Sequence, residues 1–470
     1  MAASLATHGS RSLGAALLGI ISLVACSPDR DLADDESSTA DTETDADHTD
    51  TDAPTWWRDV EPVVRTACVT CHSPDNIGPF SLETYDEFLA LAPILAPAIE
   101  SGQMPPWPPG DDCNTYANDR SLSDDQQELL LSYMAGDMPE GDPADSPPDG
   151  PPAREVVPDA VLEMAEPYTP TSADDYRCFT MPWPEDITED RFVTALEVYP
   201  GERSLVHHVI MFVVEADQAD DFLDLDANDP GPGYTCFGGP GTAPGLPPTW
   251  LGAWVPGLEA GFAPEGVGLR VTPGSMLIMQ VHYHATPGMD LADRSSIGVE
   301  MQASVDRPAV ILPMTNIAWL AGNGAMHIPA GDPDVTHETT IDNTHPVMAN
   351  LIANGLGAPA DADLEIHDGG LHMHLFGKRG RLQVRDKGGG NEACIVDVPR
   401  WDFNWQSSYL LEQPLILSPD RELHLQCWWD NSAENQPFVD GVQLEPSDLD
   451  WGDRTLDEMC LGIMYITAAK

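Results

Sequence analysis

His372-Met373-His374 lies inside the stretch Asp368-Gly369-Gly370-Leu371-His372-Met373-His374-Leu375-Phe376-Gly377. In an extended strand, residues two apart point to the same face, so the two imidazoles can meet at one point while Met373 points away. Met459, in Asp457-Glu458-Met459-Cys460, can add a thioether to this pair. Two imidazoles and a thioether suit copper better than zinc or magnesium. Without the other histidines, a polar pair on a solvent-facing strand is an equally good interpretation.

More histidines occur upstream, in Val206-His207-His208-Val209 and in Gln280-Val281-His282-Tyr283-His284. Neighbours on a regular strand face opposite ways, so His207 and His208 can share a metal only if the backbone is bent or bulged there. The alternative is that one of them is not a ligand. The second segment offers one or two further ligands on a strand, His282 and His284, and His284 could instead be an ordinary polar residue.

The patterning after residue 158 predicts a mainly β fold. Short runs such as Phe192-Val193-Thr194-Ala195-Leu196-Glu197-Val198 alternate with Pro/Gly turns, which is typical of antiparallel sandwiches. Before that point, residues 55–140 read as a small all-α domain that closes on a helix with Ser123 as its N-cap. Residues 141–158 are rich in Pro, Asp and Gly and predict a stiff linker.

The helical region carries Cys68-Val69-Thr70-Cys71-His72. Two thiols at this spacing can bind the two vinyl groups of a haem, and His72 can supply one axial ligand, so we predict a covalent c-type haem. Met104, in a Gly- and Pro-punctuated loop, is the candidate for the second axial ligand. The alternatives are a redox cysteine pair, and a Met104 that only packs on the ring.

The N-terminus predicts export. The apolar run of residues 13–25 is too short to span a bilayer and reads as a signal peptide. Its end, Leu23-Val24-Ala25-Cys26, resembles a bacterial lipobox with Cys26 as the lipidated residue, and Ser27 fits an outer-membrane lipoprotein of a Gram-negative bacterium. The alternative is cleavage and release into the periplasm. Residues 27–54 are acidic and poor in large apolar side chains, so we expect a disordered tether.

The net charge of -57 excludes nucleic acid as a partner, because binding phosphates needs basic patches. The lipid anchor would be the only membrane attachment.

Several motifs follow one another between about residue 165 and the C-terminus. They are His207-His208, Trp254, Ala263-Pro264-Glu265-Gly266-Val267-Gly268-Leu269-Arg270-Val271, Gln280-Val281-His282-Tyr283, His372-Met373-His374 with Gly377-Lys378, and Asp457-Glu458-Met459-Cys460. Their order closely resembles the type II copper, ascorbate-dependent monooxygenases, the family of peptidylglycine α-hydroxylating and dopamine β-monooxygenases. The helical region lies outside this resemblance.

The resemblance implies two jelly-roll-like β-sandwich domains, here residues 159–306 and 307–470, with one copper ion each. It implies an electron-transfer copper on His207, His208 and His282, and an oxygen-activating copper on His372, His374 and Met459. It also implies the disulfides Cys178–Cys236 and Cys427–Cys460. Cys113 and Cys394 are left over, and they could form a bridge or stay free.

The implied function is hydroxylation of a C–H bond of a small organic substrate with O2. Electrons would come from ascorbate, from the fused haem or from a redox partner protein. Where peptide-amidating members hold their substrate with Arg, Asn and Tyr, this chain has Gly370, Leu461 and Ile463, so we expect a more apolar pocket. The alternatives are a copper–haem electron carrier without an organic substrate, and a copper- or partner-binding surface lipoprotein.

Overall fold

The computed structural model describes residues 53–470, except 75, 77, 149–153, 186, 242–247, 256–257, 259, 286–289 and 440. The predicted signal peptide, Cys26 and nearly all of the acidic tether therefore lie outside the described residues, as does the middle of the Pro-rich linker. The chain divides at Ala53, and Pro54–Lys470 make one compact unit. Among the described residues, no helix is both long and apolar enough to cross a membrane.

The N-terminal part of this unit is helical. Trp56, Phe88 and Tyr133 are the largest buried side chains of a hydrophobic cluster that its helices share. Ser123 caps its helix with a reciprocal capping box, which confirms the predicted N-cap. The helices and helical turns are η1 (Trp56–Val60), α1 (Glu61–Ala67), α2 (Tyr85–Glu100), α3 (Asp124–Ala135), η2 (Pro143–Asp145), α4 (Ala219–Asn228), η3 (Trp319–Ala321), α5 (Pro346–Asn350) and η4 (Leu351–Gly355).

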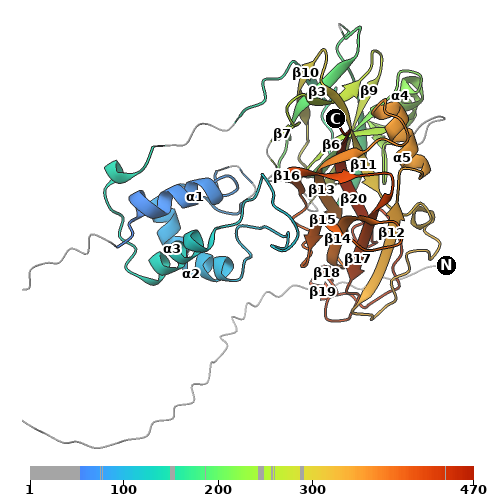
Figure 1. The fold of residues 1–470 in the computed structure, drawn as a ribbon. Helices are drawn as coiled ribbons and strands as arrows, with labels where there is room; N and C mark the ends of the chain where they lie inside the picture. The colour runs from blue at the N-terminus through green and yellow to red at the C-terminus, as the bar shows by residue number, and fades with distance from the viewer. Residues whose placement is uncertain are drawn as a thin grey trace, which may run out of the picture. The chain divides into compact units, whose positions relative to one another are not determined.

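From Ala160 onward the fold is mainly β, as predicted. Its strands belong to sheets of 14, four and two strands (Figure 1). In the first half the strands are β1 (Ala160–Glu163), β2 (Asp174–Pro182), β3 (Arg191–Tyr199), β4 (Val206–Val214), β5 (Tyr234–Thr235), β6 (Thr249–Trp254), β7 (Gly261–Phe262), β8 (Val267–Val271), β9 (Met276–His284) and β10 (Ser296–Gln302). In the second half they are β11 (Arg307–Met314), β12 (Val335–Ile341), β13 (Leu364–His372), β14 (Gly377–Asp386), β15 (Ala393–Val398), β16 (Ser408–Leu417), β17 (Arg421–Trp429), β18 (Phe438–Val439), β19 (Val442–Gln443) and β20 (Leu461–Ala468).

Strand β11 joins the two halves of the large sheet. It runs parallel to β8 over Arg307–Ala309 and antiparallel to β20 over Ala309–Met314, and Ile311 also bridges to Trp250 of β6. The strands that carry the predicted histidines are therefore connected in the order β13-β20-β11-β6-β4-β9. The second sheet, β12-β17-β14-β15, shares a hydrophobic core with β13 and β20 that includes Met373, Leu382, Leu425 and Met464.

Three disulfides cross-link the described chain. Cys178–Cys236 and Cys427–Cys460 are the two that the family resemblance implied. The third joins the two leftover cysteines, Cys113 and Cys394. Sequence alone could not decide this pairing, because the two residues are 281 positions apart.

Cys113 lies in a segment that we call the strap, residues 107–118. Asn114 and Tyr116 donate side-chain hydrogen bonds to the carbonyls of Cys394 and Ile395, at 2.9 Å each. The Trp107 ring packs edge-on against Tyr409, with 5.3 Å between centroids. The strap thus packs on the hydrophobic core of the C-terminal β strands, although in sequence it follows shortly after α2.

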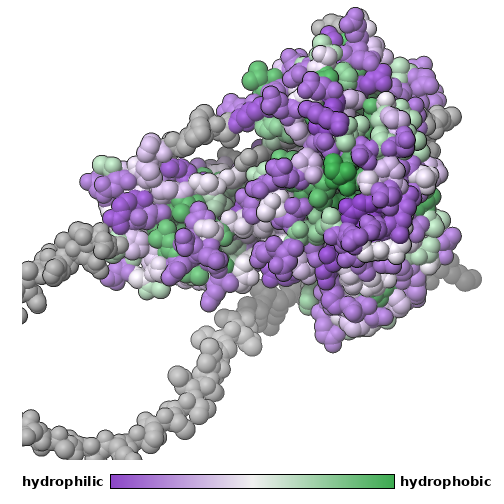
Figure 2. Space-filling model, in the orientation of Figure 1, coloured by the Kyte–Doolittle hydropathy of each residue, from purple (hydrophilic) through white to green (hydrophobic). Residues whose placement is uncertain are grey.

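The face shown in Figure 2 is largely hydrophilic, with small hydrophobic patches between the polar side chains. This surface agrees with the acidic composition of the chain.

We predict a pH-dependent contribution of Asp368, on β13, to stability. Its carboxylate accepts the backbone N–H of Tyr465 at 2.7 Å, and burial raises its pKa from 3.8 to about 6. The folded state then binds this proton more tightly than the unfolded state, so the wild type loses stability as the pH rises from about 4 through 6. Asp368→Asn removes the charge. The free energy of unfolding of this variant minus that of wild type should therefore be about 2 kcal/mol larger at pH 8 than at pH 4.

Denaturant titrations followed by tryptophan fluorescence at both pH values would measure this difference. Asp361→Asn, at an exposed position before β13, is the matched control and should show no such pH dependence. An Asp368→Asn variant whose difference from wild type is the same at both pH values would refute the assignment.

Candidate metal centres

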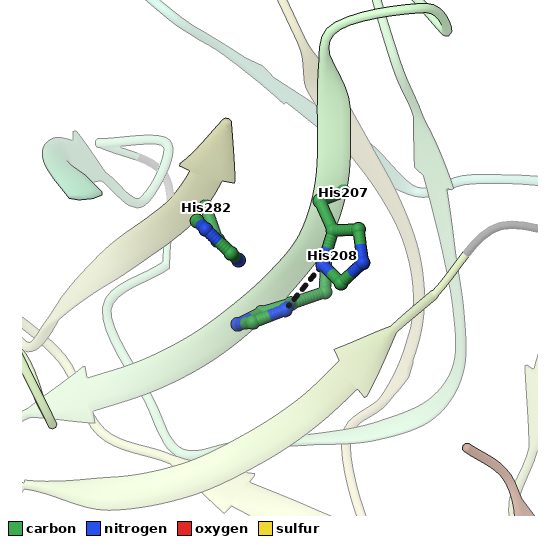
Figure 3. Close-up of side chains that lie close together, drawn as sticks. All are labelled: His207, His208 and His282. Atoms are coloured by element: carbon green, nitrogen blue, oxygen red, sulfur yellow. Dashed lines mark hydrogen bonds between the residues drawn. The ribbon is translucent and has the colours of Figure 1, made fainter. Parts of the chain in front are cut away.

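A β-bulge at His207 brings the first three histidines together. Between β4 and β9, Val206 pairs with Tyr283 but His208 pairs with His282, so His207 is the extra residue. A metal shared by His207 and His208 would require a bend or a bulge here, and the bulge is present. The three rings lie 4.8–5.5 Å apart between centroids and converge in Figure 3. Their ligand nitrogens all lie within 4.8 Å of one another, close enough to hold one metal ion.

A carboxylate orients the third ring of this cluster. His282 Nε2 lies 3.2 Å from Asp174 Oδ1, and this hydrogen bond lowers the pKa of Asp174 to about 2. His282 Nδ1 is buried and has no hydrogen-bond partner among the described residues. A buried, unpartnered nitrogen is costly unless something absent from the structure binds it, so the site fits a metal. Tyr176 stacks flat on the same ring, 4.1 Å between centroids.

The other two histidines are neutral at physiological pH. Burial, followed by the neighbouring imidazoles, lowers the pKa of His207 to about 4 and that of His208 well below its usual range. Their Nδ1 atoms are 3.3 Å apart. Because a metal binds the neutral imidazole, this environment prepares both rings for a ligand role.

His372 and His374 form a second cluster, as the alternation predicted. Their rings are 5.1 Å apart between centroids, while the Met373 side chain is fully buried in the hydrophobic core. His372 Nδ1 lies 2.5 Å from Gln406 Oε1, and His374 Nδ1 lies 3.1 Å from the Asp457 carbonyl. Both partners are acceptors, so each Nδ1 carries the proton and each Nε2 keeps its lone pair for a metal. Burial lowers the pKa of His374 to about 3 and also lowers that of His372.

Met459 is held beside this pair by Glu458. His372 pairs with Leu461 at the end of the β13–β20 ladder, and beyond it the backbone N–H groups of His374 and Met459 both donate to Glu458 Oε2. The buried Glu458 carboxylate accepts the backbone N–H groups of His374, Phe376 and Met459 and the indole N–H of Trp429. Burial raises the pKa of Glu458 to about 7. The Cys427–Cys460 disulfide adds a covalent link next to Met459.

The three positions that depart from the peptide-amidating pattern lie along these same strands. Gly370 pairs with Ile463, and His372 pairs with Leu461. Leu461 and Ile463 are half-buried and alternate with buried residues of β20, so they share one face of this strand, at the end nearest Met459 in sequence. This face is therefore apolar.

Sequence reasoning missed the loop Trp401-Asp402-Phe403-Asn404-Trp405-Gln406. Trp401 Nε1 donates to the His374 carbonyl at 3.0 Å, Gln406 orients His372, and Phe403 contacts rings of both clusters. The high density of aromatic residues was the only local indication of a role. Asp174 was missed as well, because nothing near it in sequence marks it as a partner of His282.

His284 lies at the edge of the first cluster. Its side chain is 69% exposed, and its Nδ1 lies 3.6 Å from Asp174 Oδ1. Its ring centroid is 6.3 Å from that of His207. Asp174 thus contacts both histidines of β9.

In the helical region, one helical turn connects the predicted haem-binding residues. The N–H groups of Cys71 and His72 both donate to the Cys68 carbonyl. His72 is buried, its ring stacks on Phe80, and its Nδ1 lies 3.2 Å from the Phe80 carbonyl, which leaves Nε2 available as an axial ligand.

Gly78 and the two thiols complete the surroundings of this turn. A Cβ on Gly78 would lie 2.6 Å from His72 Nδ1, so only glycine fits there. None of the three disulfides includes Cys68 or Cys71, and burial raises the pKa of the Cys68 thiol to about 11. Met104 is half-buried just after α2, where its N–H donates to the Ala98 carbonyl, and its role as second axial ligand stays a prediction.

Comparisons with known proteins do not assign the chain to a family. No protein-family model and no curated protein matches the sequence. The major capsid protein P2 from bacteriophage PM2 is 9% identical, with a TM-score of 0.26 over 66% of this chain and 98% of that one. PNGF-II is 9% identical, with a TM-score of 0.25 over 66% and 65%. Infectious bursal disease virus VP2 is 11% identical, with a TM-score of 0.17 over 68% and 74%. Similarities this low carry no argument about fold or function.

Proposed function

We propose that the protein is a copper-dependent monooxygenase that hydroxylates a C–H bond of a small organic substrate with O2. The observation that carries this proposal is the pair of unlike histidine clusters. One has three imidazoles, and the other has two imidazoles and Met459, whose backbone N–H donates to the same Glu458 carboxylate as that of His374. Bound copper would supply one-electron steps and oxygen activation at these sites.

In this proposal each cluster has a distinct role. His372, His374 and Met459 hold the copper at which oxygen reacts, with Gln406 and the Asp457 carbonyl fixing the imidazole protons on Nδ1. His207, His208 and His282 hold the copper that stores the second electron, with Asp174 fixing the His282 ring. Buried, preoriented ligands bind metal more tightly than mobile ones, because less order is lost on binding.

The substrate class follows from the face beside Met459. Leu461 and Ile463 offer apolar contact, and Gly370 offers no cation for a carboxylate. A peptide with a free carboxylate would leave its charge unpaired there, which is costly. We therefore propose a small, predominantly apolar organic molecule rather than a peptide.

We further propose that a c-type haem on Cys68, Cys71, His72 and Met104 supplies the electrons. In this view residues 55–140 are a small cytochrome c-like domain, and residues 159–306 and 307–470 are two jelly-roll-like domains. The strap supports electron transfer within one molecule. Cys113 lies nine residues after Met104, and its disulfide to Cys394 attaches this part of the chain to the C-terminal strands. Nine residues reach about 32 Å at most.

The disulfides agree with an exported chain, and we propose an outer-membrane lipoprotein anchored at Cys26, or a periplasmic protein.

The first prediction concerns stoichiometry. Purified holoprotein should contain one covalent haem and two coppers. Cys68→Ala together with Cys71→Ala should remove the haem and leave both coppers, because the thioether bonds are lost while the histidine clusters are untouched. Pyridine haemochrome spectra and metal analysis would measure this. Covalent haem that survives the double substitution would contradict the assignment.

The second prediction separates the two coppers. Met459→Ala should reduce hydroxylation to background and leave the copper on His207, His208 and His282 in place, since only one site loses its soft ligand. Met464→Leu, on the opposite, buried face of β20, is the matched control and should keep activity. Oxygen uptake, product analysis and the EPR spectrum of the remaining Cu(II) are the measurements. Wild-type turnover by Met459→Ala would exclude the site on His372, His374 and Met459. Electron transfer by the wild-type protein without any hydroxylated product would favour an electron carrier.

The third prediction concerns the electron donor. The Pro-rich linker of residues 141–158 raises the effective concentration of haem near the copper sites to roughly millimolar. Reduced haem mixed rapidly with Cu(II) in both sites should therefore oxidise at a rate independent of protein concentration. This phase should disappear when His207 and His208 are replaced by alanine, as the three-histidine copper is the proposed entry point. A rate proportional to protein concentration would show transfer between molecules instead.

A further inference from the structure

Phe403 contacts one imidazole of each histidine cluster. Its ring stacks on His207, with 5.6 Å between centroids and 22° between planes. It also meets His374 edge to face, with 6.1 Å between centroids and 86° between planes. Both geometries are ones that aromatic pairs favour. His207 follows the start of β4 and His374 follows β13, so this one ring connects residues from the two halves of the large sheet.

The loop around Phe403 is fixed on both sides by the second cluster. Trp401 donates its indole N–H to the His374 carbonyl, and its backbone N–H to the Lys378 carbonyl, at 3.0 Å each. Gln406 accepts from His372 and donates its amide to the Phe403 carbonyl at 2.9 Å. The ring position is therefore set by the same hydrogen bonds that orient His372 and His374. A side chain placed only to fill space would need none of these links.

We propose that Phe403 is the bridging contact for electron transfer between the two clusters, an inference that rests on the proposed copper function. With copper bound, His207, His208 and His282 would hold the ion that gives up one electron, and His372, His374 and Met459 would hold the ion that takes it, so the first copper is oxidised and the second is reduced. Phe403 forms and breaks no bond and moves no proton. Its ring supplies a continuous path of atoms in contact where solvent would otherwise lie.

The test compares wild type with Phe403→Leu, Phe403→Tyr and Asn404→Ala in the full-length copper-loaded protein. Leucine fills the space with an aliphatic group, and tyrosine keeps the ring. Asn404→Ala is the matched control, because Asn404 is exposed and its side chain contacts Asp402 within the same loop. Copper content, the distance between the two Cu(II) ions from pulsed EPR, and the rate of electron redistribution after substoichiometric flash reduction are measured for each protein.

We expect every variant to bind two coppers at the wild-type distance. Phe403→Leu should slow redistribution about tenfold, whereas Phe403→Tyr and Asn404→Ala should stay near the wild-type rate. A Phe403→Leu variant with the wild-type rate would overturn the proposal. Loss of a copper or a changed distance in that variant would also overturn it, because the ring would then be a structural support. Wild-type protein that fails to bind two coppers would instead overturn the proposed function itself.

Discussion

Strand β11 pairs with β8 along one part and with β20 along another, and this pairing connects the strands that carry both histidine clusters. Hydrogen-bonded ladders fix register, and a slip by one residue turns every side chain of a strand to the opposite face. The positions of His208, His372 and Met459 relative to one another therefore depend on β11. Arg307 at its start strengthens the junction, because its guanidinium pairs with Glu365 and donates to Thr467 Oγ1.

Each cluster combines a regular ladder with one local exception. The bulge at His207 allows adjacent histidines to share a face, and the end of β13 at His372 lets His374 turn towards Asp457 and Glu458. Orienting acceptors then decide which imidazole nitrogen stays free. At His282 it is Nδ1, and at His372 and His374 it is Nε2. Two chemically different sites thus arise from the same residue type, histidine, because the hydrogen-bond partner decides which ring nitrogen is free to bind a metal.

Sequence periodicity predicted what depends on neighbouring residues. The alternation around Met373, the need for a bulge beside His208 and the cap at Ser123 all follow from local geometry, and all are present. The partners of the histidines could not be predicted in this way. Asp174 lies 108 residues from His282, and Gln406 lies 34 residues from His372. Such contacts depend on how whole strands pair, which no local pattern encodes.

The Cys113–Cys394 bond illustrates the same limit at longer range. The family resemblance left Cys113 and Cys394 unassigned, and only the folded chain brings the strap beside β15. The resemblance to copper monooxygenases supplied the other two pairings, because it covers those cysteines and leaves out the helical region.

The central claim is that the chain builds two copper sites of different ligand type. X-ray absorption at the copper edge of the fully reduced protein tests it most directly, because nitrogen and sulfur ligands scatter differently. The account predicts two coppers per chain and sulfur scattering equivalent to one thioether for every two coppers, with imidazole nitrogen as the remaining protein ligation. A protein that binds copper without any sulfur scattering, or that binds only one copper, would contradict it.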